Sequence, residues 1–153
     1  MAAEPANLSL KLRAEDEEDL SVISACLQDS LVLVGDLAYF PEEKRFMLVA
    51  NRFLWERGKP RPAVAHERAL AGVVFGGVEA VTYRGFQKGD RERLLCLLAA
   101  RYEVDAGKAA IILEFSAGAI VRLEVTRIDC RVKDLGEPWP ALWRPAHDIG
   151  ETI

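Results

Sequence analysis

Apolar residues recur at every second position along most of this chain, from about residue 31 to residue 132. The pattern is clearest where Val121, Leu123 and Val125 alternate with polar or charged side chains. A period of two residues places alternate side chains on opposite faces of a sheet. Because the apolar runs are separated by turn residues, the pattern predicts a body made mainly of antiparallel β-strands.

The N-terminal part of the chain has a different period. An acidic block at residues 15–19 precedes Leu20, Ile23 and Leu27, which recur at helical spacing. Acidic residues are favoured in the first turn of a helix by its dipole. The pattern predicts one amphipathic helix near residues 16–29, with the acidic block solvated in its first turn.

Turn residues in the sequence mark where each predicted strand ends. Residues 94–104 fit either a helix or a buried strand, and Tyr102 and Val104 favour the strand. Gly76 and Gly77 predict a bulge or tight bend. The expected strands cover residues 8–12, 31–40, 45–55, 69–86, 94–104, 110–116 and 119–132.

These elements predict an α+β fold. We expect an antiparallel β-sandwich or partly open barrel of seven to eight strands with one amphipathic N-terminal helix, similar in outline to pleckstrin-homology-like modules. The helix should cover one open end or face of the sheet. Residues 1–153 are expected to form a single domain. Residues 133–153, rich in proline, are expected to form an ordered irregular tail packed on the sheet.

Composition narrows the class of protein. The 153 residues are 50% hydrophobic and 29% charged, which is typical of a globular chain. The net charge of −4 disfavours non-specific nucleic-acid binding. Neither a secretory signal nor a membrane span is visible, and three widely spaced cysteines fit a reducing compartment. These features favour a cytoplasmic protein without a membrane partner.

The motifs for common chemistries are missing from the sequence. His66 and His147 are far apart and no cysteine pair exists, so no metal site is expected. No glycine-rich phosphate-binding motif is present, so no nucleotide or flavin cofactor is expected. His147 and Asp148 have the residue types of a catalytic triad if a remote serine or Cys130 is the nucleophile. A catalytic triad is defined by its geometry, however, so these residue types alone are a weak signal.

Polar residues interrupt the apolar strand at residues 45–55. Arg45 and Asn51 share one face by alternation, and Arg52 lies on the other. Asn51 and Arg52 could bind an anionic or peptide-like group, because arginine forms a bidentate fork with carboxylates. The alternative, which we favour, is that Arg52 pairs internally with Asp29 or Asp36 and that Asn51 satisfies a strand end.

Two further features allow two interpretations each. Trp139 and Trp143 could cap a pocket or grip a partner, but burial over the sheet is the more common role of such residues. The basic loop at residues 57–61 could contact RNA, although few aromatic side chains accompany it. We expect a solvated loop there.

Several short motifs resemble a known family over nearly the whole chain. They are Glu18-Asp19-Leu20, Leu27-Gln28-Asp29, Arg45-Phe46, Asn51-Arg52-Phe53-x-Trp55, Asp134-Leu135-Gly136-x-Pro138-Trp139 and Pro145-Ala146-His147. Together they resemble an uncharacterised alphaproteobacterial family, domain-of-unknown-function family 2948. The resemblance implies a small bacterial cytoplasmic protein of no named activity. It nominates, for function or for structure, Gln28, Asp29, Arg45, Asn51, Arg52, Trp139 and His147.

The sequence therefore favours a non-catalytic binding or adaptor module over an enzyme. It would act through the polar strand and the aromatic tail, on an unknown protein or a small anionic ligand. The residues nominated for binding are Arg45, Asn51, Arg52, Trp139, Trp143 and His147. The alternative is a small hydrolase or isomerase that uses His147 with a carboxylate such as Asp148. A homodimer formed through an uncovered strand edge is left open.

Overall fold

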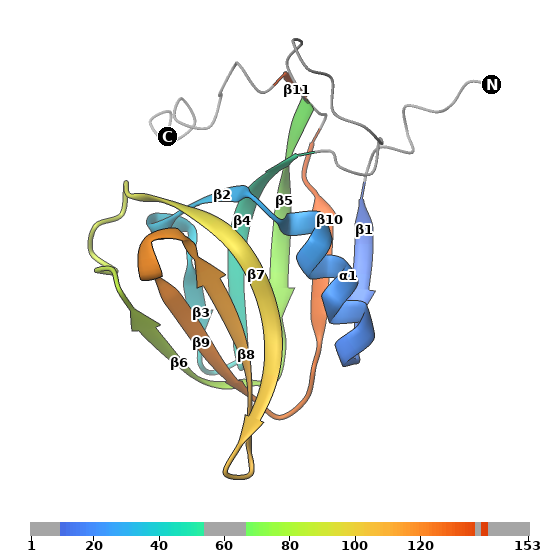
Figure 1. Cartoon of the computed structure of the whole chain (residues 1–153), viewed down its shortest axis with the longest axis vertical. Helices are drawn as coiled ribbons and strands as arrows, with labels where there is room; N and C mark the ends of the chain where they lie inside the picture. Colours follow the sequence, from blue (N-terminus) through green and yellow to red (C-terminus); the bar gives the residue numbers. More distant parts are fainter. Residues whose placement is uncertain (1–9, 54–66, 137–138, 141–153) are drawn as a thin grey trace, which may run out of the picture.

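The computed structural model describes residues 10–53, 67–136 and 139–140. Within these ranges the chain forms one helix and a sheet of eleven strands, and every strand pairing is antiparallel (Figure 1). The elements are β1 (Lys11–Ala14), α1 (Glu17–Leu27), β2 (Ser30–Leu33), β3 (Ala38–Phe40), β4 (Arg45–Phe53), β5 (Glu67–Phe75), β6 (Val78–Arg84), β7 (Leu94–Asp105), β8 (Lys108–Phe115), β9 (Ile120–Val125), β10 (Cys130–Asp134) and β11 (Trp139–Pro140).

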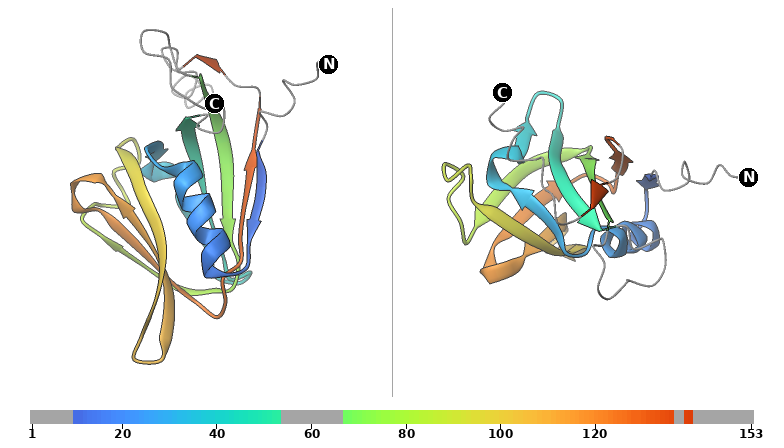
Figure 2. Two further views of the ribbon diagram at one scale, coloured as in Figure 1. Left: turned by 45° about the vertical axis from the view of Figure 1, so that its right-hand side comes forward. Right: turned by 90° about the horizontal axis from the view of Figure 1, so that it is seen from above.

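The sheet is open and consists of two halves. Its strand order is β1-β10-β5-β4-β2-β7-β8-β9-β6, with β3 beside β4 and β11 beside β5. β2 connects the halves, because it pairs along its length with β7 and meets β4 only at Leu31, opposite Asn51. The halves diverge from this connection, and α1 lies in the angle between them (Figure 2).

The helix confirms the expectation from its sequence. Asp16 is its N-cap and accepts a hydrogen bond from the Asp19 N–H, at 2.8 Å. Leu20, Ile23 and Leu27 are buried. They join one hydrophobic core with side chains from both halves of the sheet. The helix therefore fills the space that an open, bent sheet would otherwise leave exposed to water.

The expected mostly antiparallel sheet with one helix is confirmed, but the expected seven to eight strands are too few. The strand expected at residues 31–40 is divided by a 3₁₀ turn, Val34–Asp36. This turn lets β2 cross to β7 while β3 stays on β4. The strand expected at residues 119–132 is divided as well, because residues 126–129 carry the chain from β9 in one half to β10 in the other.

The bend predicted at Gly76 and Gly77 separates β5 from β6. Gly77 has a φ of 70°, which favours glycine. A Cβ atom on Gly77 would also lie 2.9 Å from the Thr126 hydroxyl oxygen. The bend therefore needs glycine for two separate reasons, one conformational and one steric.

The C-terminal tail is described only in part. Residues 133 and 134 complete β10, and β11 pairs with β5 beyond them. Trp143 and His147 lie outside the described residues, as does the basic loop at residues 57–61.

Candidate functional site

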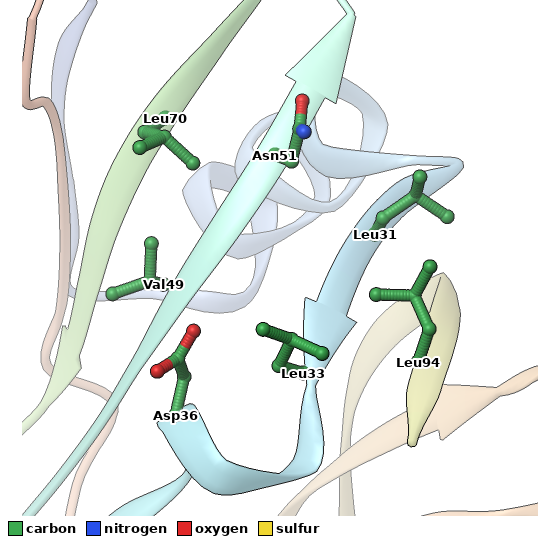
Figure 3. A pocket seen from close by; sticks show the side chains of 7 residues that line it. All are labelled: Leu31, Leu33, Asp36, Val49, Asn51, Leu70 and Leu94. Carbon is green, nitrogen blue, oxygen red and sulfur yellow. The ribbon is translucent and has the colours of Figure 1, made fainter. Parts of the chain in front are cut away.

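A shallow hollow opens on the outer face of the sheet, where its two halves meet (Figure 3). It has about 290 Å³ of space, counting its open side. Its lining residues come from β2, the following 3₁₀ turn, β4, β5 and β7, and they are Leu31, Leu33, Asp36, Val49, Asn51, Leu70 and Leu94. The helix lies behind the sheet as seen from the hollow (Figure 3).

Alternation along β4 explains why apolar groups face this hollow. Phe46, Leu48 and Ala50 point into the core and are at most 3% exposed. Val49 and Asn51 therefore point to the opposite face, where both line the hollow. β4 has a neighbouring strand on each side, β5 and β2.

Asn51 lies at one end of the hollow and is held by Arg68 of β5. The Arg68 Nε donates to the Asn51 side-chain oxygen at 2.7 Å, and its Nη2 donates to the Asn51 backbone oxygen at 2.7 Å. Both residues are buried. Arg68 thus fixes the orientation of the Asn51 amide, whose oxygen is occupied by this contact.

Asp36 supplies the carboxylate of the hollow. Burial raises the pKa of Asp36 above its ordinary value, and the nearby positive charge of Arg91 opposes that rise. Arg91 lies beside the 3₁₀ turn, because its backbone oxygen accepts from the Gly35 N–H at 2.9 Å. Asp36 is the charged residue among those that line the hollow, and apart from Asn51 the others are apolar.

Arg52 points the other way, into the protein. Its Nε and Nη2 donate to the two carboxylate oxygens of Asp134 at 2.9 and 2.8 Å. Neither side chain is more than 2% exposed. The favoured interpretation placed Arg52 in an internal pair with Asp29 or Asp36, but its partner here is Asp134.

The two charges meet across β5, which separates β4 from β10. The register places Arg52 opposite Ala69, and Asp134 opposite Ala71. Alanines at these two positions leave room for the ion pair to form over β5. Asp134 also accepts from the Leu10 N–H at 2.7 Å, so one carboxylate ties the start of β1 to β4.

The remaining nominated residues are not brought to one place. Arg45 is exposed at the start of β4 and pairs with Glu43 at 3.4 Å. It lies six positions from Asn51, about 20 Å along a strand. Trp139 lies opposite Arg68 in the strand register, on the other side of β5 from Asn51. Trp143 and His147 are outside the described residues.

Gln28 and Asp29, nominated by the family motifs, complete the turn from α1 into β2. The Gln28 N–H donates to the Ala25 oxygen, and the Asp29 N–H donates to the Leu97 oxygen at 2.7 Å. Asp29 has a φ of 68°, a conformation in which aspartate is found more often than most residues. Their backbones therefore shape the turn from α1 into β2.

Sequence reasoning missed Asp134 as the partner of Arg52, although the pattern contained a signal. In β10, Cys130 and Val132 occupy core positions and Asp134 occupies the next one. Arg52 follows Phe46, Leu48 and Ala50 in the same way on β4. Two opposite charges, each at a core-facing position of its strand, predict a buried ion pair. Arg68 and Asp36 carried no comparable signal.

The cysteines of the sheet are poor nucleophiles. Burial, with a smaller effect from Asp129, raises the pKa of Cys130 to about 12. Burial also raises the pKa of Cys96, and the negative charge of Asp29 adds to that rise. The thiolate is the reactive form, so both side chains remain largely protonated near neutral pH.

Within the described ranges, no group of three or more histidine, cysteine, aspartate or glutamate side chains could hold a metal ion. Within the same ranges, no helix has both the length and the apolar character needed to cross a bilayer.

Together, the fold and the hollow define a small α+β protein built on an open antiparallel sheet, with an apolar recess on its outer face. The chain belongs to the family described as protein of unknown function (DUF2948), whose model matches residues 10–147. The resemblance of the motifs to domain-of-unknown-function family 2948 is thereby confirmed. No curated protein and no solved structure matches the chain significantly.

Proposed function

We propose that this protein is a non-catalytic binding or adaptor module, and that the hollow is the centre of its binding surface. The observation that carries the proposal is the apolar character of the outer face. Leu33, Val49 and Leu70 line the hollow, although the core lies on the other side of the sheet. Leu94 and Leu98 of β7 are 40% and 45% exposed. An apolar recess with exposed leucines on one of its strands is typical of interaction sites.

The size and lining of the hollow support a protein partner. Pockets for small molecules usually enclose about 300–1,000 Å³. The hollow encloses only about 20 Å³ and is otherwise open to solvent, so it suits contact with an apolar side chain of a partner better than a whole cofactor. Because its charged lining residue is Asp36, it favours an apolar protein segment over a small anionic ligand.

The alternative, a hydrolase or isomerase that uses His147, gains no support from the described residues. Arg52 is engaged with Asp134, and the raised pKa of Cys130 argues against a thiolate nucleophile. We also place the protein in the cytoplasm, as its sequence indicates. A homodimer could use the outer edge of β1 or β6, the two end strands of the sheet.

Affinity capture from a bacterial lysate tests the proposed surface. Val49→Asp adds a charge to the hollow, and Val104→Asp is the matched control on β7 at a side chain that is 62% exposed. Partners held by wild type should be lost from Val49→Asp and kept by Val104→Asp. Thermal melts must first show that both variants are folded. Identical partner sets for all three proteins would refute the proposal.

A further inference from the structure

Four cationic residues gather on the outer face of the sheet, where β1 and β10 lie side by side (Figure 1). The strand register places Lys11 of β1 directly opposite Lys133 of β10, and Arg13 opposite Arg131. All four residues are exposed, whereas Val132, between the two cations of β10, is buried in the core. Since side chains alternate along a strand, the cations point away from the core. We call these four residues the cationic patch.

Folding does not account for the whole of this patch. Like charges placed directly opposite each other in a sheet are destabilising. Charged residues on an end strand protect its edge from unwanted pairing, which explains Lys11 and Arg13. β10 is not an end strand, because it lies between β1 and β5. Arg131 and Lys133 therefore require another explanation.

The charges of the patch are only partly compensated. Glu15 lies 2.8 Å from the guanidinium of Arg13, and Asp129 lies 3.7 Å from that of Arg131. The two lysines of the patch take part in none of the ion pairs formed among the described residues. Their charges are therefore available to an anionic group from outside.

The cationic patch borders the hollow. Lys133 is opposite Gly72 of β5, and Gly72 is opposite Val49 of β4, which lines the hollow. Two strand spacings, about 10 Å, thus separate Lys133 from Val49. The Leu135 side chain lies over Gly72, 3.4 Å from where a Cβ atom would be, and Leu135 is 56% exposed. The outer face therefore changes from cationic to apolar over a short distance.

We propose that the cationic patch and the hollow together bind an extended acidic segment of a partner protein. Carboxylates of the segment contact the patch, and a neighbouring apolar side chain contacts the hollow. This inference rests on the proposed function and specifies the chemistry of its partner. Alternate residues of a strand lie about 6.6 Å apart, so the two cations of each strand match carboxylates at alternate positions of an extended segment.

The charges on the outer face also orient this segment. Asp36, the charged residue that lines the hollow, follows β2, which is three strands away from β10 in the sheet. Like-charge repulsion at Asp36 and attraction at the patch both direct the carboxylates of the partner toward β10 and β1.

The surroundings of the patch favour a polypeptide over a nucleic acid or an anionic membrane. Residues 15–19 carry five carboxylates, all five residues are exposed, and the first of them, Glu15, touches Arg13. A phosphate polymer or a membrane surface extends far beyond a patch of two by two side chains. It would come within a Debye length, about 8 Å, of this acidic block. A short acidic segment can contact the patch and the hollow without crossing the block.

Selection of a random peptide library on the full-length protein tests the chemistry of the partner. The recovered peptides should combine Asp or Glu at alternate positions with a large apolar residue. Fluorescence anisotropy then measures the affinity of one recovered peptide, synthesised with a label. Lys133→Glu should weaken its binding about tenfold or more, because it reverses a charge of the patch. Lys108→Glu, at a lysine of β8 whose side chain is 69% exposed, is the matched control and should leave the affinity nearly unchanged.

Thermal melts of the isolated protein separate binding from folding. Lys133→Glu places a glutamate opposite Lys11, so its melting temperature should equal or exceed that of wild type. A clearly lower melting temperature would contradict the repulsion within the patch. Lys133→Gln, which removes the charge without reversing it, would then carry the binding measurement, and it should weaken binding several-fold.

Equal affinity of the peptide for wild type and for the Lys133 variants would overturn the inference, as would recovered peptides without acidic residues. Tighter binding of polyuridylate or of phosphatidylserine vesicles than of any recovered peptide, lost in Lys133→Glu, would also overturn it, because the ligand would then be a phosphate group.

The proposed function can fail separately, because Val49→Asp tests the hollow and Lys133→Glu tests the patch. Partner capture that is lost from Val49→Asp and kept by Lys133→Glu would refute the acidic segment and leave the binding surface at the hollow in place. The opposite result would support the patch and refute the hollow as the centre of the surface.

Discussion

Arg52 has the largest side chain among the fully buried residues of the described structure. A guanidinium in the interior is tolerable only when a counter-charge and hydrogen bonds replace water. Asp134 supplies both, through two hydrogen bonds of 2.8 and 2.9 Å. The identity of both residues is therefore explained by folding. A bound ligand is not required to explain why both residues occur in the family motifs.

Asp134→Asn should destabilise the protein strongly, because it removes the buried negative charge that pairs with the Arg52 guanidinium. We expect the free energy of unfolding to fall by about 3–5 kcal/mol, measured by urea denaturation. Lys133→Ala, an exposed neighbour on β10, should change it by less than about 0.5 kcal/mol. Replacing both charges, as Arg52→Leu with Asp134→Leu, should recover part of the loss. A fully stable Asp134→Asn would contradict the role of the pair.

Cys130 should make stability depend on pH in the alkaline range. Its pKa is raised from 9.0 to about 12 in the folded protein, so above pH 9 the unfolded chain loses the thiol proton first. The contribution of Cys130 is complete below pH 9 and is lost as the pH rises through about 12. Urea denaturation from pH 9 to 11 should show a shallower decline for Cys130→Ala than for wild type. Parallel declines would show that the pKa is not raised.

At the scale of elements, the helix was predictable and the strand breaks were not. The spacing of Leu20, Ile23 and Leu27 and the cap at Asp16 are local signals, so the sequence predicted the helix well. In β9 the residues that face the core have odd numbers and end at Val125, whereas in β10 they have even numbers and begin at Cys130. That change is a signal of a strand break in the sequence itself. The break at residues 34–36 depends on β2 reaching β7, which is not a local property.

Ile23→Asp should unfold the protein, because Ile23 is 1% exposed and an aspartate there would bury an unpaired charge. Val22→Asp is the matched control, since Val22 is adjacent on α1 and 52% exposed. Circular dichroism melts should show a cooperative transition for wild type and Val22→Asp, and none for Ile23→Asp. Equal melting temperatures for the two variants would mean that α1 does not pack through Ile23.

At the scale of the whole molecule, the candidate site arises from the angle between the two halves of the sheet. The hollow draws residues from β2, β4, β5 and β7, whose positions depend on long-range pairing. Alternation predicted that Asn51 faces away from Arg52, but it could not predict that Leu33 and Leu70 flank the same recess. Arg45, predicted on the same face as Asn51, remains at the far end of β4.

The pairing of β1 with β10 also bears on how the protein is made. β1 has β10 as its strand partner, and the Leu10–Asp134 contact spans 124 positions of the chain. While the polypeptide is being synthesised, β1 and the Arg52 guanidinium both lack these partners until β10 emerges, much later in the chain. A chain that ends before β10 exposes the edge of β1 and leaves Arg52 without the Asp134 carboxylate, conditions under which nascent proteins depend on chaperones.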